Sequence, residues 1–263
     1  MTINDVFTDL TKEGDELDAV VAHLDDAQWS TPTPAEGWTV AHQIAHLAAT
    51  FKLATLAAGA PEIFEKVKAG LSPDFEANVN AAMAPYLAEP PARLLQRFRE
   101  ERAAADKALG ALTGDTLVPW LVRPLPASVL AAAGMMELFG HGQDVYDALG
   151  VRRVYDDRVG HLCFFGARTW DFGYQARNLP VPDVALRFEL TAPSGTMWTF
   201  GPADATEIVR GPAVDFCMLV TRRRHRDDLA LVAAGKLADE WLNLAQAYRG
   251  PAGPGRKPGQ FVR

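Results

Sequence analysis

Four long segments with apolar residues at helical spacing dominate the first 150 residues of the chain. They cover about residues 3–27, 40–58, 91–112 and 127–149, with Pro- and Gly-containing stretches between them. Thr39 is a suitable N-cap for the second segment, and Gly150 directly follows the fourth, where helices commonly end. Helices of this length that each bury one apolar stripe predict an antiparallel four-helix bundle. Prolines and glycines divide residues 60–90, so we expect irregular helical cover there.

The pattern changes after Gly150. Three short segments alternate apolar and polar residues and are rich in β-branched and aromatic side chains, at 184–192, 195–201 and 205–211. They predict three strands of a small antiparallel sheet, with a further helix at about 156–176 and helical spacing again after the strands. The sequence therefore predicts an α+β protein: a four-helix bundle at 1–150, a smaller α+β domain at 151–250, and a Gly/Pro-rich tail at 251–263 that we expect to be disordered.

Composition and charge exclude several classes of protein. No run of about eighteen uncharged apolar residues appears, so no membrane span is expected. The N-terminal sequence lacks the basic and apolar regions of a secretory signal, which favours a cytoplasmic protein. A net charge of −7 argues against a nucleic-acid-binding surface. The two cysteines, Cys163 and Cys217, are too few for a disulfide framework, and we interpret them as core thiols.

One dense basic segment, TRRRHRDD at residues 221–228, stands out from this acidic background. It is typical of a solvated strand end or turn. It is also compatible with an anion clamp, because guanidinium groups bind carboxylates through two parallel hydrogen bonds. The residues by themselves leave both interpretations open.

Two helices of the predicted bundle carry metal-ligand residue types at one-turn spacing. Glu137, His141 and Asp144 lie at i, i+4 and i+7 and therefore share one helix face. Burying them without partners would cost several kcal/mol in rough terms. A divalent ion such as Zn²⁺ would remove that cost, and His46 on the second helix can supply a third ligand. The alternative is a surface ion pair or a polar cap on the bundle, with His46 an ordinary packed histidine.

The two segments GWTVAHQIAHL (37–47) and MELFGHGQDVYDALG (136–150) resemble the DinB-like metal-binding superfamily, and within it the mycothiol-dependent maleylpyruvate isomerase group. The resemblance implies that His46, Glu137 and His141 are metal ligands and that Asp144 supports the site or fixes the helix. The later segment RGPAVDFCMLVTRRR (210–224) is similar to the C-terminal domain of the same group, which resembles a sterol-carrier fold. That similarity implies a functional arginine at Arg222 or Arg223.

The chain departs from this group at two places. Gly134 and Met135 stand where the isomerases commonly have an arginine, and His42 stands where an acidic residue is frequent. His42 is open to three interpretations: a mere neighbour, a fourth metal ligand, or a proton shuttle. The departures indicate a side branch of this group. The resemblance implies the group's fold and metal for this chain more strongly than it implies the group's reaction or substrate.

The resemblance implies a cytoplasmic metalloenzyme, acting on a small molecule as a monomer or homodimer. Its cofactors would be a divalent metal, foremost Zn²⁺, and a mycothiol-like thiol for isomerisation or S-transfer on a small electrophilic substrate. An arginine at 222 or 223 would hold a substrate carboxylate. The alternatives are a hydrolase or lyase that uses metal-activated water, and a non-enzymatic protein that binds a small molecule or lipid in a metal-dependent way.

Overall fold

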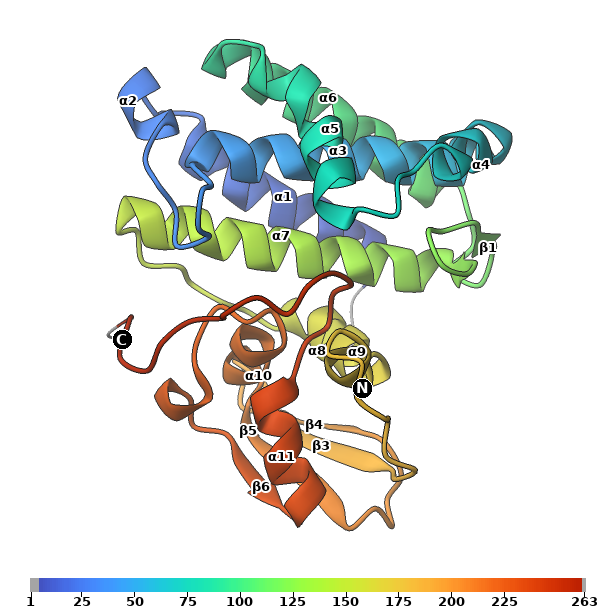
Figure 1. The fold of residues 1–263 in the computed structure, drawn as a ribbon, viewed down its shortest axis with the longest axis vertical. Coiled ribbons are helices and arrows are strands. Elements are labelled where there is room, and N and C mark those ends of the chain that lie inside the picture. Colours follow the sequence, from blue (N-terminus) through green and yellow to red (C-terminus); the bar gives the residue numbers. More distant parts are fainter. Residues whose placement is uncertain (1–4, 262–263) are drawn as a thin grey trace. The chain divides into compact units, whose positions relative to one another are not determined.

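The computed structural model describes residues 5–261, and the chain divides into two compact units. The first unit is Asn4–Arg153 and the second begins at Val154. Each unit buries its own set of apolar residues, and Figure 1 shows the helices and strands of both. The first unit is helical, and the second combines helices with a small sheet, which confirms the predicted α+β class.

Four long helices form the first unit. They are α1 (Val6–Val21), α3 (Val40–Gly59), α6 (Pro91–Gly110) and α7 (Ala127–Leu149). Helix α1 contacts α6 and α7, and α3 contacts the same two helices, so the four helices run alongside one another in a closed ring (Figure 1). Shorter elements connect them, namely α2 (Asp26–Trp29), α4 (Pro61–Ala69), α5 (Phe75–Leu87) and the paired two-residue strands β1 (Leu117–Val118) and β2 (Leu125–Pro126).

The helix limits follow from local sequence signals. The predicted helices at 40–58, 91–112 and 127–149 agree with α3, α6 and α7 to within two residues. Gly150 adopts a left-handed conformation with φ 65°, which glycine reaches without strain, and so ends α7. The single helix predicted over 3–27 is wrong, because α1 ends at Val21 and Asp25 caps the separate short helix α2.

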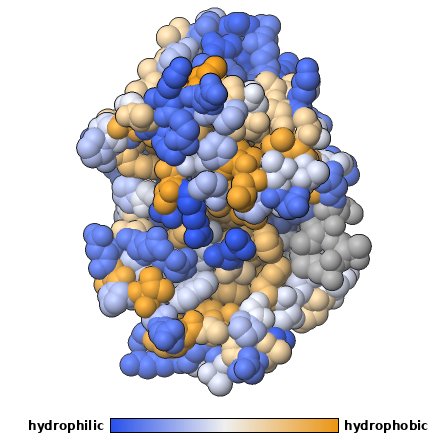
Figure 2. Space-filling view, turned by 90° about the vertical axis from the view of Figure 1, so that its right-hand side faces the viewer, coloured by the Kyte–Doolittle hydropathy of each residue, from blue (hydrophilic) through white to orange (hydrophobic). Residues whose placement is uncertain are grey.

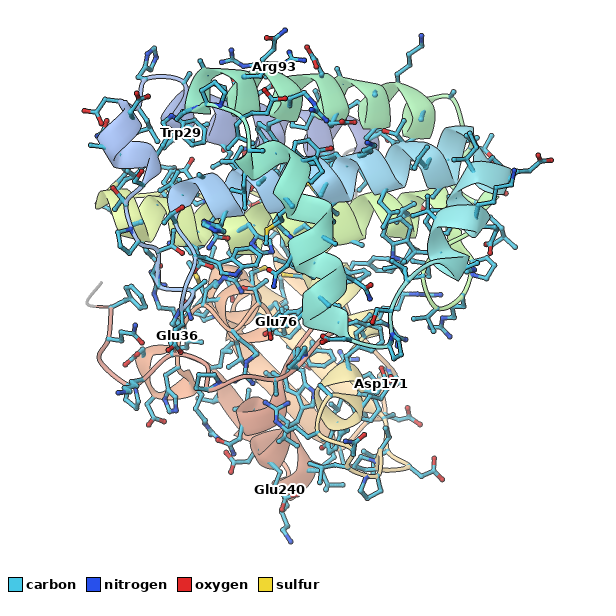
Figure 3. All side chains as sticks on the ribbon, turned by 45° about the horizontal axis from the view of Figure 1, so that its top comes forward. Trp29, Glu36, Glu76, Arg93, Asp171 and Glu240 are labelled. Carbon is cyan, nitrogen blue, oxygen red and sulfur yellow. The ribbon has the colours of Figure 1, made fainter. Side chains whose placement is uncertain are left out.

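Each long helix buries a stripe of apolar side chains. On α3, the side chains of Val40, Ile44 and Leu47 are fully buried. On α6, Leu94 is buried whereas Arg93 extends outward, as Figure 3 shows. The apolar stripes thus define which faces of α3 and α7 meet, and this meeting positions the polar residues described below.

The second unit contains a four-stranded sheet with strand order β4-β3-β5-β6. Its strands are β3 (Leu186–Thr191), β4 (Met197–Phe200), β5 (Glu207–Pro212) and β6 (Val232–Ala234). The expectation of an antiparallel sheet is wrong, because β3 pairs with β5 in parallel while the other two pairings are antiparallel. The chain crosses β3 at Gly201, where φ is 90° and a Cβ atom would lie 2.2 Å from the carbonyl oxygen of Leu186. Glycine permits this crossover.

Helices cover one face of this sheet. They are α8 (Val159–Arg168), α9 (Phe172–Gln175), α10 (Ala213–Val220) and α11 (Lys236–Leu244), with a 3₁₀ turn at Arg226–Asp228. The single helix predicted over 156–176 is therefore two helices, α8 and α9. Phe188, Phe216 and Trp241 meet edge-to-face or stacked in the core, with ring centroids 5.2–6.1 Å apart. This aromatic cluster fixes α10 and α11 against β3.

The last residues of the chain contain no helix or strand in the part that the structure describes. The backbone N–H of Gly259 donates to the carboxylate of Asp228, and Arg222 Nη2 donates to the carbonyl oxygen of Gly253 at 3.2 Å. Disorder of residues 251–263 stays a prediction, and residues 262–263 lie outside the described range.

The described helices include none that is both long and apolar enough for a membrane crossing. On the face shown in Figure 2, hydrophobic residues occur in separate patches among hydrophilic ones.

Candidate metal centre

Three side chains with metal-binding atoms meet where α3 packs against α7. His46 comes from α3, and Glu137 and His141 come from successive turns of α7. One ligand atom from each lies within 4.8 Å of the others, and all three side chains are partly buried. The sequence placed Glu137 and His141 on one face, and the packing of α3 against α7 brings His46 to it.

The distances within this cluster match those around a metal ion. Nε2 of His141 lies 3.2 Å from Oε2 of Glu137, and Nε2 of His46 lies 3.4 Å from the same oxygen. Charge-assisted N–H···O bonds are usually shorter, about 2.7–2.9 Å. Zinc–ligand bonds of about 2.0–2.2 Å in a tetrahedral site place neighbouring ligand atoms about 3.4 Å apart. The two distances to the Glu137 oxygen are therefore those expected for neighbouring ligands of one ion.

The electrostatics of the cluster keep its carboxylate ionised. Burial alone would raise the pKa of Glu137, but hydrogen bonds from His141 and His46 and the positive charge of these groups outweigh burial. The pKa of the carboxyl therefore lies well below its usual range. An anionic oxygen between two imidazoles is the donor set that Zn²⁺ and similar divalent ions prefer.

A buried amide, Gln43, contacts the Nδ1 atom of His141, the ring nitrogen that faces away from Glu137. Its Oε1 lies 2.6 Å from Nδ1 of His141. Its Nε2 donates to Oγ1 of Thr33 at 2.9 Å and faces Oδ2 of Asp144 at 3.5 Å. Sequence reasoning missed Gln43, although its position three residues before His46, on the neighbouring row of α3, is a signal for a supporting residue.

An aromatic side chain, Trp38, lies against both histidines of the cluster. Its ring stacks on that of His141 with centroids 5.7 Å apart and an interplanar angle of 21°, and its centroid is 5.4 Å from that of His46. Trp38 belongs to the loop before α3, where the backbone N–H and the hydroxyl of Thr33 both donate to the carbonyl oxygen of Trp38. The loop is thereby fixed close to the cluster. The sequence resemblance included this tryptophan only as part of a helix start.

His42 has a different role in the helix. It lies at the third position of α3, where its Nδ1 accepts from the backbone N–H of Thr39 at 3.3 Å and lies 2.8 Å from the Thr39 hydroxyl. These contacts satisfy donors at the helix start, as a capping box does. Burial lowers the pKa of His42. Among the described residues, the group with metal-ligand spacing contains His46, Glu137 and His141 and omits His42.

Of the remaining predicted site residues, Asp144 lies in the first unit, and Arg222 and Arg223 lie in the second. Asp144 is fully buried on α7, one turn beyond His141. Arg222 and Arg223 follow α10 in the second unit. Arg222 has an unusual left-handed backbone with φ 59°, and its buried Nε has no hydrogen-bond partner among the described residues. Arg223 Nη1 donates to the carbonyl oxygen of Thr221 at 2.5 Å.

The packing of α7 against α1 accounts for one departure from the isomerase pattern. A Cβ atom at Gly134 would lie 3.0 Å from Cδ1 of Leu10, and Met135 is buried. Leu10 therefore occupies the space that a long side chain at position 134 would need.

Taken together, these features define an α+β protein whose helical unit carries a two-histidine, one-carboxylate candidate metal site. Residues 10–146 match the family model for the mycothiol maleylpyruvate isomerase N-terminal domain. The chain therefore belongs to this family, as the sequence motifs predict. A second match, residues 182–234, is to a family described as wyosine base formation.

Relatives with known sequence or structure agree with this assignment. The chain is 40% identical over 248 residues to Uncharacterized protein Rv0036c of Mycobacterium tuberculosis, covering 94% of this chain and 96% of that protein. Its fold is similar to the crystal structure of the mycothiol-dependent maleylpyruvate isomerase, with a TM-score of 0.52 and 20% identity over 81% of this chain and 86% of that one. At this identity the structural likeness shows the fold alone.

Proposed function

We propose that the protein is a metal-dependent enzyme that binds a low-molecular-weight thiol and acts on a small electrophilic substrate. His46, Glu137 and His141 would hold a divalent ion, foremost Zn²⁺. The observation that carries the proposal is the spacing of 3.2 and 3.4 Å from the two Nε2 atoms to one carboxylate oxygen.

The hydrogen bond between Gln43 and His141 supports a cation at this place. Since the Gln43 carbonyl oxygen faces Nδ1 of His141, a neutral His141 carries its proton on Nδ1. Its Nε2 then presents a lone pair toward the anionic Glu137 oxygen. A proton or a metal ion must lie between these two electron-rich atoms, and a bound divalent ion would replace the proton that Nε2 otherwise donates to Glu137.

The thiol comes from the family relationship. The structurally similar isomerase is described as mycothiol-dependent, and the family model carries the same name. A bound divalent ion would lower the pKa of a coordinated thiol and keep it as the nucleophilic thiolate. Addition of the thiolate to a conjugated carbon forms a C–S bond and permits rotation, and elimination then releases the thiolate and the isomer. Protonation of the adduct instead gives S-transfer.

The chain's own cysteines are not needed for this chemistry. Cys163 and Cys217 are fully buried next to each other in the second unit, with their Sγ atoms 3.6 Å apart. The thiol that reacts would therefore be an added one.

Arg222 is the better candidate for binding a carboxylate of the substrate or thiol. Its Nε is buried without a partner, and the pKa of Arg177 is lowered by burial and by the positive charge of Arg222. Within residues 5–261, Arg177 and Arg222 form no ion pair with a carboxylate, whereas Arg226 of the same basic run is paired with Asp239 at 2.6 Å. An anion bound to Arg222 would relieve this excess of positive charge.

Metal analysis followed by thiol titration tests the proposal. The purified protein should contain about one divalent ion per chain by elemental analysis. After cobalt substitution, addition of mycothiol should produce a thiolate-to-cobalt charge-transfer band. Because both cysteines are fully buried within the second unit, this band reports the added thiol. A protein without metal would overturn the metal site, and a cobalt protein whose spectrum ignores thiols would overturn the thiol chemistry.

A further inference from the structure

The Gln43 carboxamide contacts three side chains next to the cluster. Gln43 is fully buried on α3, and its side chain contacts two residues of α7 and one residue of the loop before α3. The carbonyl oxygen contacts Nδ1 of His141 at 2.6 Å, while the amide nitrogen contacts Thr33 at 2.9 Å and Asp144 at 3.5 Å. One acceptor and two donors are thus each assigned to a separate neighbour.

The neighbours dictate which end of the amide faces which group. Oδ2 of Asp144 accepts from the Gln43 amide nitrogen at 3.5 Å, which places the nitrogen end of the amide toward Asp144. The hydroxyl of Thr33 donates to the carbonyl oxygen of Trp38 at 2.9 Å, and it is therefore also an acceptor toward Gln43. Both contacts require the same orientation of the amide. The carbonyl oxygen is then left facing His141, where it can accept only if Nδ1 carries a proton.

We infer that Gln43 is a positioning residue that fixes the tautomer of His141. Asp144 and Thr33 orient the Gln43 amide, the amide holds the proton of His141 on Nδ1, and the lone pair of Nε2 is thereby directed toward Glu137 and the metal position. This inference rests on the proposed metal site. It also gives Asp144 a physical role: its carboxylate sets the direction of a hydrogen-bond chain that ends at a ligand atom.

The same chain of contacts includes the loop that carries Trp38. Thr33 joins the Gln43 amide to the Trp38 backbone, and the Trp38 ring stacks on His141. His141 is thus held by a hydrogen bond at one ring edge and by a stacked ring at one face. Two independent contacts on one imidazole restrict both its rotation and its protonation state, as a preorganised ligand requires.

The tautomer is measurable in the metal-free protein by ¹⁵N NMR of the histidine ring at about pH 8.5, well above the ordinary imidazole pKa. We expect His141 to be protonated on Nδ1 in the unaltered protein. In Gln43→Met, which keeps the side-chain length and removes the amide, the Nδ1–H form should lose its dominance. Gln246→Met is the matched control, since Gln246 is equally buried in the second unit and bonds only to backbone carbonyls of Tyr248 and Gly250 in the described structure.

If Gln43→Met does not fold, a second variant, Asp144→Asn, tests the same inference. Asp144→Asn keeps the shape but presents either a donor or an acceptor, so the Gln43 amide can reverse and His141 should become a mixture of tautomers. Dominance of the Nε2–H form in the unaltered protein, or an unchanged tautomer in the folded variants, would overturn the inference.

Metal affinity provides the readout that links the tautomer to the site. Loss of a partner behind a metal-bound histidine commonly weakens binding about 10–100-fold, and Gln43→Met should weaken zinc binding by that factor while Gln246→Met leaves it unchanged. Equal zinc affinity of the unaltered protein and Gln43→Met would contradict the positioning role. Absence of zinc binding in the unaltered protein would refute the proposed function. The positioning role of Gln43 is tested separately, because the tautomer of His141 is measured in the metal-free protein.

Discussion

Metal-induced thermal stabilisation should distinguish the proposed ligand His141 from the nearby His42. A ligand that binds only the folded state stabilises it by about 2.7 kcal/mol at a concentration 100 times its Kd. The unit that contains the cluster spans Asn4–Arg153. For a domain of about this size, each kcal/mol raises Tm by roughly 2–4 °C, so zinc at 100 times Kd should raise Tm by about 5–11 °C.

The substitution His141→Ala removes one of three donor atoms, and the zinc-induced shift should fall to about 1 °C or less under the same conditions. His42→Ala should keep the full shift, because the Nδ1 atom of His42 is engaged at Thr39 and His42 lies outside the ligand group. Differential scanning fluorimetry of the chelated and zinc-loaded proteins measures both. An unreduced shift in His141→Ala would refute the ligand assignment, and a lost shift in His42→Ala would show that the site uses four protein ligands.

Further perturbations test the packing of α7, the second unit and the need for metal. Gly142→Ala should raise the free energy of unfolding by about 0.5–1 kcal/mol, since its Cβ would meet neighbours at ordinary distances of 3.6–3.8 Å. Gly134→Ala should lack this gain, because its Cβ would lie 3.0 Å from Leu10. Urea denaturation compares the two variants. Arg222→Gln should raise KM for a carboxylate-bearing substrate about tenfold or more, and the ion-paired Arg226→Gln should not, by steady-state kinetics. Chelation should abolish thiol-dependent turnover and zinc should restore it; turnover unaffected by chelation would contradict the metal requirement.

Much of the first unit could be predicted from sequence because its signals are local. Helix α7 has apolar residues at helical spacing and ends at Gly150, whose left-handed conformation is a property of that one residue. The proximity of Glu137 and His141 likewise follows from their four-residue spacing within one helix. In the structure, Nε2 of His141 lies 3.2 Å from Oε2 of Glu137. Such features are decided within one or two helical turns and need no knowledge of the rest of the chain.

The second unit was less predictable because strand pairing is not local. Alternating residues located β3, β4 and β5, but their order and direction depend on the crossover at Gly201. Strand β6 has only three residues, Val232–Ala234, which is too short to show an alternating pattern. Its pairing with β5 exists only once the chain has folded back on the sheet.

The candidate site shows which features the sequence by itself did not determine. It determined two helices with ligand residue types and indicated His46 as a third ligand. It left open whether His42, one turn earlier on the same helix, is a neighbour, a fourth ligand or a proton shuttle. Burial of Ile44 and Leu47 sets the rotation of α3 against its neighbours, and with this packing His46 lies at the cluster while His42 is engaged at Thr39.

The supporting contacts of Gln43 were also decided only by the tertiary structure. Gln43 contacts His141 98 positions away and Asp144 101 positions away in the sequence. No local rule assigns partners over such separations. The physical reason is that a hydrogen bond depends on atomic positions to within a few tenths of an ångström, and those positions are set by how the helix surfaces pack. Helical periodicity therefore determined which elements could carry a metal site, and helix packing determined which side chains form it.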